Sequence, residues 1–515
     1  MKSEKDKIMK HTKRLVLIIA SLLTQICLSQ GKDEPMLYRQ DFKSISANNT
    51  VTVTSYKKNG KDFVFVGGFG SIDVFDLNKE GVLTPISNHD VFKQKGPARG
   101  MVADNINGTD FLFVANKYGN VIETFKILDS GSLDRVGLVE DTDETHLGVA
   151  ITLQVIHMKK SSYLFIGGLE EDPGLSSFKI HDNGKLTHVQ SMKDNESIFT
   201  DGIIGMFTHK IKGKTFLYTS GFQDNGVSSF RIYENGTFKN VNNISDNRTD
   251  TYLTGAYPVT GVQLGSNYYI IVGHRHHKYY ENNGFIKNTD FYYHGDGVSV
   301  FKVNNKGALV PHYVLKDDDS TKLQGQTRIE VVSINDKEAV LAVGTRDDAS
   351  IQLCKLNEEG ILTPLNYLET GFSIYYGLRS HKIGEDNFLI AGSNKFDFGK
   401  VVSYKIEPKI NREGNVLRHI VNLKYKEDAT KEQVDEAVNM FLNLKNEIPE
   451  IANIEWGLND SKEGHSEGFT HTFTITFNNE HGREIYLFHK AHLDLVSKVG
   501  PIIGGVFVMD YWTSN

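Results

Sequence analysis

Between residues 63 and 406, one sequence block recurs seven times. Each copy has an apolar strand, a turn containing Gly and a second strand that usually ends in an aromatic residue, Lys or Arg, and an aliphatic residue, as in Phe111–Val114 followed by Thr124–Ile127. The copies lie about 50 residues apart, with one longer interval of about 71, and such a period is typical of a β-propeller or a similar array. One sheet of short strands cannot bury both of its faces alone, so the sheets are expected to stack around an axis.

The repeats therefore predict an all-β, seven-bladed propeller over residues 36–408. The segment Met36–Phe42 has strand character but no block of its own, and the last block lacks an outer strand after Ile406. Pairing these two segments removes an open sheet edge, so we expect the N-terminal segment to complete the last blade. The alternative is a frayed N-terminus. A propeller gathers loops around a central funnel, which is the expected binding site.

The first 29 residues have the pattern of an export signal. Lys10, Lys13 and Arg14 precede the apolar run 15–23, which is too short to span a membrane comfortably. Cleavage after Ser29 leaves a small residue at the cut, whereas Ile26, just before the first cysteine, does not suit a lipoprotein site. We therefore expect an exported bacterial protein, in the periplasm or at the cell surface, with no transmembrane segment in the mature chain.

Composition narrows the classes of partner. The net charge is −7 and no basic stripe is present, which argues against nucleic acid. Cys354 is the only cysteine beyond the signal, so no internal disulfide can form and a large apolar core must supply the stability.

The innermost strand of each blade is expected to start at the funnel mouth. Reading upstream of each apolar block gives six candidate ligand-binding residues: Arg99, His146, Asp201, Tyr257, Arg328 and Tyr375. Arginine pairs with carboxylate or sulfate, histidine transfers protons, and an aspartate can orient a histidine. As a set they predict a binding site; the alternative for each one is that it only solvates a wet channel.

The long interval carries an insertion between the second and third strands of its blade, and insertions in repeat proteins often lie on the binding face. It opens with His274, Arg275, His276 and His277, where strand alternation would place two histidines on one side, as a metal site needs. No carboxylate or thiolate stands at a recognisable ligand spacing, so we expect neither a metal nor a cofactor. We interpret the insertion as a lid, with Arg275 available to an anion; packing alone is the alternative. Rings that could stack on a sugar are Tyr279, Tyr280, Tyr292 and Tyr293.

Composition and period change after Pro408, and residues 409–417 read as a linker. A strand over 418–425 precedes a helix that opens at Thr430 with Gln433 three residues on, which is a capping box. Strands over 453–457, 470–477 and 506–511 and a second helix over 485–499 complete a β-α-β-β-α-β order. This order predicts an α+β, ferredoxin-like domain over 418–513 with helices on one side of the sheet. The other face would be bare in a monomer, so pairing with a second sheet is expected.

Residues 36–408 resemble the seven-bladed lactonase-like propellers, the group that contains 6-phosphogluconolactonase and muconate-lactonising enzymes. The resemblance rests on the blade period and on phrases such as 111–116 and 131–133. The Gly-Pro-Arg-His phrase of that group is present only as Gly96-Pro97-Ala98-Arg99, without its histidine. The resemblance therefore implies the fold, and it implies lactone hydrolysis only as an alternative.

The C-terminal region is similar to the stress-responsive dimeric α/β-barrel (Dabb) domain. The segments that carry the similarity are Arg418–Val421, Ile454–Gly457, Gly468–Phe473, His489–His492 and Asp510–Trp512. Two copies form a barrel in that family, so the single copy here implies a homodimer through the C-terminal domain.

One plant type in this family is a polyketide cyclase with a His and a Tyr in the barrel cavity. By motif position, His492 would act as general acid or base and Tyr486 would orient or donate to a carbonyl, with His471 and His489 nearby. Lys490 stands where the family usually has Pro. The alternative is that these side chains only stabilise the fold.

The leading hypothesis is an exported ligand-binding or accessory protein, whose propeller funnel holds a sugar acid, a lactone or an oligosaccharide. Its architecture resembles products of bacterial gene clusters that degrade algal or plant polysaccharide. The alternatives are a lactonase-type hydrolase at the funnel, with Arg99, His146, Asp201 and the His274–His277 loop, and cyclase-like acid/base chemistry by Tyr486 and His492.

Overall fold

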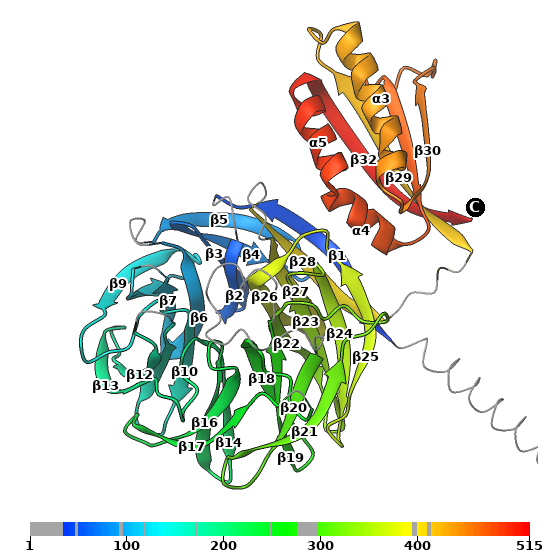
Figure 1. Ribbon diagram of the computed structural model, residues 1–515. Helices are drawn as coiled ribbons and strands as arrows, with labels where there is room; N and C mark the ends of the chain where they lie inside the picture. The colour runs from blue at the N-terminus through cyan, green and yellow to red at the C-terminus, as the bar shows by residue number, and fades with distance from the viewer. Residues whose placement is uncertain are drawn as a thin grey trace, which may run out of the picture.

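The computed structural model describes residues 34–46, 50–91, 96–117, 119–169, 172–247, 249–275, 297–393, 399–408, 412 and 414–514. Seven four-stranded antiparallel sheets surround an axis, and an eighth sheet with its helices forms a separate domain (Figure 1). The predicted seven-bladed propeller and ferredoxin-like domain are both confirmed. The export signal over 1–29 and the insertion residues His276, His277, Tyr279, Tyr280, Tyr292 and Tyr293 lie outside the described residues.

The blades follow one another along the chain. The first three blades contain β2 (Thr50–Lys58), β3 (Lys61–Gly68), β4 (Ser71–Leu77) and β5 (Leu83–Asp90); β6 (Ala98–Ile106), β7 (Thr109–Asn116), β8 (Val121–Ile127) and β9 (Leu133–Glu140); and β10 (Thr152–His157), β11 (Ser162–Gly167), β12 (Gly174–Ile180) and β13 (Leu186–Lys193). Blades four and five contain β14 (Ile203–Ile211), β15 (Lys214–Gly221), β16 (Gly226–Ile232) and β17 (Phe238–Ser245); and β18 (Ala256–Leu264), β19 (Asn267–His274), β20 (Gly297–Val303) and β21 (Leu309–Lys316). Blades six and seven contain β22 (Gln326–Ile334), β23 (Glu338–Thr345), β24 (Ser350–Asn357) and β25 (Leu362–Glu369); and β26 (Ile374–Ile383), β27 (Asp386–Ser393), β28 (Lys400–Pro408) and β1 (Pro35–Ser44).

The first strand of each blade contacts the first strands of both neighbouring blades, so these seven strands line the axis. The ring closes as predicted, because β1 pairs antiparallel with β28, from Pro35 opposite Pro408 to Ser44 opposite Lys400. A second link joins the last blade to the first: His381 Nε2 lies 2.7 Å from an Asp62 carboxylate oxygen, and both side chains are nearly buried.

At the junctions between blades, a turn glycine of one blade packs against an aromatic ring of the preceding blade, so both residues recur with the period of the repeat. Gly184, in the turn between β12 and β13, has φ +80°, and a Cβ added there would lie 2.7 Å from the Phe111 ring of the preceding blade. The same contact recurs at other blade junctions between the pairs Gly81 and Phe388, Gly131 and Phe63, Gly236 and Tyr163, Gly307 and Phe216, and Gly360 and Tyr269. The positive φ and the ring together favour glycine at these positions.

The C-terminal domain contains β29 (Asn415–Tyr425), α3 (Lys431–Glu447), β30 (Ile451–Leu458), β31 (His471–Phe477), α4 (Glu480–Phe488), α5 (Lys490–Val499), η2 (Gly500–Ile502) and β32 (Ile503–Ser514), and its sheet has the order β30-β31-β29-β32. Thr430 and Gln433 form the predicted capping box at α3. The expected single helix over 485–499 is wrong. His489 takes an extended conformation (φ −66°, ψ 139°), and its ring accepts a hydrogen bond from the Ala491 amide, which ends α4 and starts α5.

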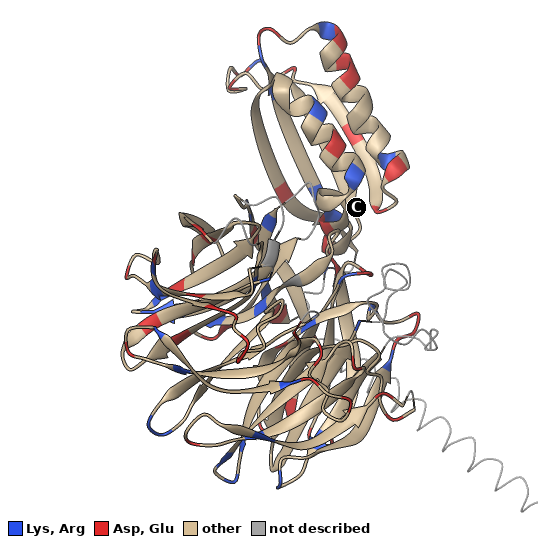
Figure 2. Cartoon of the chain, turned by 60° about the vertical axis from the view of Figure 1, so that its left-hand side comes forward, with Lys and Arg blue, Asp and Glu red and all other residues tan. Residues whose placement is uncertain are grey.

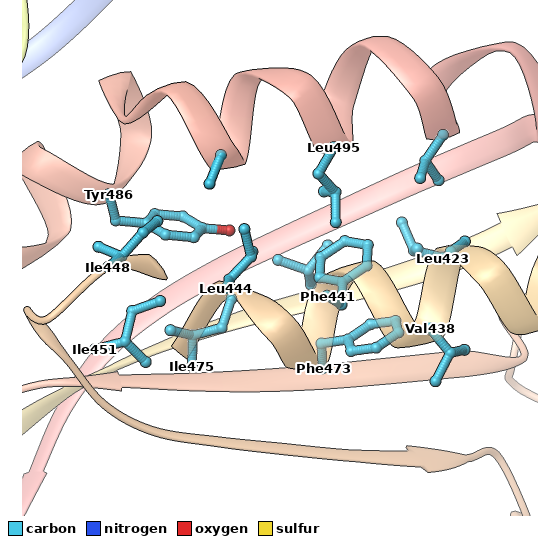
Figure 3. Close-up of a cluster of buried hydrophobic side chains, with 14 of the residues drawn as sticks. Leu423, Val438, Phe441, Leu444, Ile448, Ile451, Phe473, Ile475, Tyr486 and Leu495 are labelled. Atoms are coloured by element: carbon cyan, nitrogen blue, oxygen red, sulfur yellow. The ribbon is translucent and has the colours of Figure 1, made fainter. Parts of the chain in front are cut away.

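The core of this domain lies between the helices and one face of the sheet (Figure 3). Phe441 of α3 stacks on Phe473 of β31 with ring centroids 4.0 Å apart. Val438 and Leu444 extend the same stripe of α3, because residues three and four apart share a helix face. No described helix is long and apolar enough to cross a membrane.

Helix α4 is the element of this domain that packs on the propeller (Figure 1). Phe488 is buried in a cluster that otherwise belongs to blades six and seven, with its ring centroid 5.1 Å from that of Phe372 and 6.3 Å from that of Phe42. Beside it, the Arg39 Nε lies 3.5 Å from an oxygen of the buried Glu484 carboxylate. The two domains are therefore joined by an apolar anchor and a buried ion pair as well as by the connecting chain.

Candidate functional site

Six inner strands begin with a register shift: β2, β6, β14, β18, β22 and β26. Such a bulge changes the direction of a side chain and is common next to functional sites. In β6, β18 and β26 the shifted segment carries Arg99, Tyr257 and Tyr375, respectively.

These bulges bring together an arginine–tyrosine cluster of Arg99, Tyr257, Arg275, Arg346 and Tyr375, which come from blades two, five, six and seven. Three guanidinium carbons face the Tyr375 ring, at 4.4 Å for Arg275, 5.1 Å for Arg99 and 5.5 Å for Arg346 from its centroid. Arg275 Nη1 also donates a hydrogen bond of 2.8 Å to the Tyr257 hydroxyl. Cations over aromatic faces are favourable contacts, and they hold positive charge at one end of the axis.

The cluster changes the acidity of its tyrosine. Burial raises the pKa of Tyr375, but the positive charges of Arg275 and Arg99, a hydrogen bond from Arg275 and the charge of Arg346 lower that pKa to about 7 overall. Phenol and phenolate are therefore both populated near neutral pH. The phenolate would offset one of the three guanidinium charges that face the ring, and Arg346 Nε also lies 3.8 Å from an Asp347 carboxylate oxygen.

A polar cavity of about 380 Å³ lies along the axis and adjoins the cluster. Gly100, Pro258 and Leu378 line it, and they follow Arg99, Tyr257 and Tyr375 closely in the chain. Its lining also includes the carboxylate of Glu330, the guanidinium of Arg379 and apolar side chains such as Met101, Met206 and Phe207. The hydroxyl and amide side chains in the lining are Thr52, Thr54, Thr152, Gln154, Thr208, Thr260 and Ser380.

Arg328 lines this cavity with a long cationic side chain. On the inner strand of blade six, Arg328 pairs with Gly344 of the second strand. The residues at the same position on the inner strands of blades one, two and three are Thr52, Gly100 and Thr152. Because those residues are small, the guanidinium has room inside the channel. Burial lowers the pKa of Arg328, and the negative charge of Glu330 opposes that effect.

The structure does not bring His146, Asp201 and His274 into this cluster. His146 Nδ1 lies 2.8 Å from an Asp172 carboxylate oxygen within blade three. His274 is buried, and its Nε2 accepts a hydrogen bond of 2.9 Å from the Gly297 amide, so its ring joins the two ends of the insertion.

Asp201 lies between blades three and four, beside Asp194 and Asp224. One oxygen from each of the three carboxylates lies within 4.8 Å of the others. Backbone groups and a hydroxyl contact them: the Asp201 amide donates to Asp224 at 2.8 Å, and the Thr200 hydroxyl donates to Asp194 at 3.0 Å.

Arg346 is the member of the cluster that the sequence reasoning missed. It follows Gly344 by two residues, just as Arg275 follows Gly273 by two residues. Both come directly after the second strand of a blade, so the repeat register carried the signal. Reading only the residues before each inner strand could not find them.

In the C-terminal domain the rings of Tyr486 and His492 lie 4.2 Å apart, between centroids. Tyr486 is fully buried, and its hydroxyl has no hydrogen-bond partner among the described residues (Figure 3). His492 Nδ1 lies 3.2 Å from the Leu487 carbonyl oxygen, so a proton on Nδ1 leaves Nε2 as the basic atom. Burial is the main reason that the pKa of His492 falls to about 4, so the ring is neutral near pH 7.

The family model described as Stress responsive A/B Barrel Domain matches residues 417–513. A stress-response A/B barrel domain-containing protein of Arabidopsis thaliana is 32% identical over 98 residues, which are 18% of this chain and 84% of that protein. The chain belongs to the stress-responsive A/B barrel family. Olivetolic acid cyclase of Cannabis sativa is 31% identical over 95 residues of the A/B barrel domain, covering 18% of this chain and 94% of the cyclase.

Solved structures are similar to each domain. A candidate 6-phosphogluconolactonase of Bacteroides fragilis covers 65% of this chain and 94% of its own, with 17% identity and a TM-score of 0.43. A dimeric ferredoxin-like protein of unknown function from Thermobifida fusca covers 20% of this chain and 95% of its own, with 18% identity and a TM-score of 0.18.

Proposed function

We propose that the propeller binds a small sugar acid in its axial cavity, and that the A/B barrel domain makes the protein a dimer. The observation that carries the proposal is the convergence of Arg99, Arg275 and Arg346 on one tyrosine beside a cavity that also contains Arg328. A guanidinium is the side chain best suited to bind a carboxylate with two parallel hydrogen bonds.

The lining of the cavity suits a sugar better than an apolar acid. Threonine and serine hydroxyls and the Gln154 amide can exchange hydrogen bonds with ring hydroxyls, since each both donates and accepts. The volume of about 380 Å³ lies at the small end of the range of ligand pockets. We therefore expect a uronic acid or a short oligouronate.

The test compares the full-length chain with Arg328→Gln. Galacturonate at about a hundredfold excess over its Kd should stabilise the wild type by roughly 2.7 kcal/mol, and Arg328→Gln should lose this effect. Arg231→Gln is the matched control. Arg231 of β16 lies over the Phe216 ring and is not a lining residue of the cavity, so this variant should respond to galacturonate like the wild type. An equal ligand response in wild type and Arg328→Gln would contradict the proposal.

The proposed dimer interface is the sheet face of the A/B barrel domain opposite its helices. Phe507, Met509 and Tyr511 alternate along β32 opposite Asn422, Ile420 and Arg418, and each is 42–52% exposed. The helices of this domain contain residues of both charges, as Figure 2 shows, whereas these three large exposed side chains form an apolar row on the sheet. A second copy of the chain would cover that row.

Sedimentation of the full chain tests this interface. The wild type should be a dimer, and Met509→Glu should be a monomer, because a charge on a covered apolar face is costly. Val496→Glu, at an equally exposed position on α5, should stay dimeric. A monomeric wild type, or a dimer that survives Met509→Glu, would exclude this interface.

We place the protein outside the cytoplasm as an accessory protein in polysaccharide breakdown. The support is the basic and apolar pattern of the first 29 residues together with the sugar-acid site proposed above. Sequencing the N-terminus of the protein recovered from cell fractions tests this: the mature chain should start after Ser29 outside the cytoplasm. A full-length cytoplasmic product would contradict it.

A second candidate function is acid/base chemistry in the A/B barrel domain. It is favoured by the neutral His492 ring beside the buried Tyr486 ring, and by the similarity to a protein named olivetolic acid cyclase. Cyclisation of a linear polyketide by the wild type, abolished in His492→Ala, would support it. No turnover by the wild type would remove it.

A further inference from the structure

We propose that the arginine–tyrosine cluster is a catalytic centre, in which Tyr375 removes the proton from the carbon that bears the carboxylate of a bound uronate. This inference rests on the proposed uronate site and adds a reaction to it. The reaction class is β-elimination of a sugar linked to the neighbouring ring carbon.

The position of Tyr375 between the guanidinium groups carries the inference. Arg99 and Arg275 are buried, with 8% and 1% of their surface exposed, whereas Tyr375 keeps a partly exposed side chain. Leu378, three residues later on the same strand, lines the axial cavity, as do Gly100 and Pro258 beside the other cluster residues. Tyr375 and the arginines around it are not lining residues of the cavity, but they lie next to that end of it, so a uronate carboxylate bound at this end would be close to Tyr375 and to positive charge.

The chemistry requires this combination. A C–H bond next to a carboxylate is a very weak acid, because its removal leaves a dianion. Guanidinium groups that pair with the carboxylate stabilise the charge that develops on its oxygens in the transition state. A base works best when its pKa lies near the working pH, and the pKa of Tyr375 is held near 7.

One tyrosine can complete the step. The Tyr375 phenolate takes the proton from the carbon bearing the carboxylate, and the electron pair of that C–H bond forms a double bond to the next ring carbon. The bond from that carbon to the glycosidic oxygen breaks, and the departing oxygen takes the same proton back from the Tyr375 phenol. The products are a shortened sugar and an unsaturated uronate, and Tyr375 returns to the phenolate with no other reactant consumed.

The competing explanation is that Tyr375 only neutralises the arginines. Tyr375→Phe keeps the ring that the guanidinium groups face and removes the oxygen that would move the proton. Tyr218→Phe is the matched control, since Tyr218 is a fully buried tyrosine of β15 whose hydroxyl has no hydrogen-bond partner among the described residues.

The experiment incubates the full chain with 4-linked trigalacturonate and with 4-linked trimannuronate, and follows the ultraviolet absorbance of the unsaturated product. Wild type and Tyr218→Phe should form it from trimannuronate, in which the hydrogen removed and the oxygen released lie on the same face of the ring, and not from trigalacturonate, in which they lie on opposite faces. Tyr375→Phe should form it from trimannuronate at least about 100-fold more slowly while still binding the trimer. Phenolate absorbance gives a second readout: one tyrosine should titrate near pH 7 in the wild type and be absent from Tyr375→Phe.

Three results would overturn the inference. Binding of both trimers without product would leave a binding site and remove the reaction. Equal rates in wild type and Tyr375→Phe would remove Tyr375 from the reaction. Absence of binding to either trimer would exclude the reaction together with the uronate site.

Discussion

The guanidinium carbon of Arg275 lies 4.4 Å from the centre of the Tyr375 ring, although the two residues come from different blades. Arg275 follows β19 in blade five, and Tyr375 lies in the bulge at the start of β26 in blade seven. The positive charge of Arg275 lowers the pKa of the Tyr375 phenol, so the cluster contains a negatively charged phenolate when Tyr375 ionises. Binding of an anion at this end of the axis should therefore depend on whether Tyr375 is ionised.

Affinity for galacturonate should fall as the pH rises through about 7. Above that value Tyr375 carries a negative charge that competes with the ligand for the arginines, and below it the phenol is neutral. If the phenolate form binds about tenfold more weakly than the phenol form, the Kd increases by about fivefold from pH 6 to pH 8, and bound ligand still meets the phenolate. Calorimetric titration across this range measures the effect, and Tyr375→Phe should show a flat profile. A wild-type affinity that rises with pH would contradict the charge assignment.

Gly184→Ala should destabilise the propeller by several kcal/mol. A Cβ there would clash with the Phe111 ring in the preceding blade, and the residue must also keep φ +80°. Gly213→Ala is the control, since Gly213 has φ +75° with no atom within 4 Å of an added Cβ. It should cost only about 1–2 kcal/mol for the left-handed backbone. Equal losses in urea unfolding would show that the contact between blades contributes nothing.

Phe488→Ala should loosen the contact between the two domains. Truncating a buried Phe typically costs about 3–5 kcal/mol, and here the lost contacts are with Phe42 and Phe372 of the propeller. Hydrogen exchange should speed up in α4 and the adjoining β1 of the full chain. Val496→Ala, at an exposed position of α5, should change neither element. Unchanged exchange in α4 of Phe488→Ala would mean that the connecting chain alone holds the domains together.

The A/B barrel domain should lose stability as the pH falls from about 6.5 to about 4. His492 has a folded pKa of about 4 and an ordinary value of 6.5, so in this window the unfolded state binds one more proton. The loss should be on the order of 3 kcal/mol and should be complete below the folded pKa.

Tryptophan fluorescence isolates this domain, because the only two tryptophans of the chain, Trp456 and Trp512, both lie in it. His492→Asn removes the titrating group and should show a smaller loss between pH 6.5 and pH 4. A variant with the same pH dependence as the wild type would assign the effect to another group.

The repeat made the propeller predictable in detail. Its period identified seven blades, and the unmatched strand at Met36–Phe42 identified the closure, because an unfilled sheet edge is costly. The glycine and aromatic positions of the repeat are contacts between successive blades, which is why they recur at fixed spacing. The capping box at Thr430 likewise fixed the start of α3.

The site was predictable only in part, because it depends on three-dimensional detail. The position of each bulge decides which residue points to the axis, and a count from the apolar block cannot supply it. Counting upstream from the apolar blocks identified three members of the arginine–tyrosine cluster, Arg99, Tyr257 and Tyr375. In blade three the same count gives His146, which lies outside the cluster because the inner strand of that blade starts only at Thr152. The contact of Phe488 with the propeller joins two domains and leaves no periodic signal in either.

The most direct test is a crystal structure of the full-length protein with bound galacturonate. We expect the sugar in the axial cavity, with a carboxylate oxygen within hydrogen-bond distance of Arg328 or of the arginines around Tyr375. Density for the sugar in the A/B barrel domain or on the outside of the propeller, with the axial cavity holding only water, would contradict it.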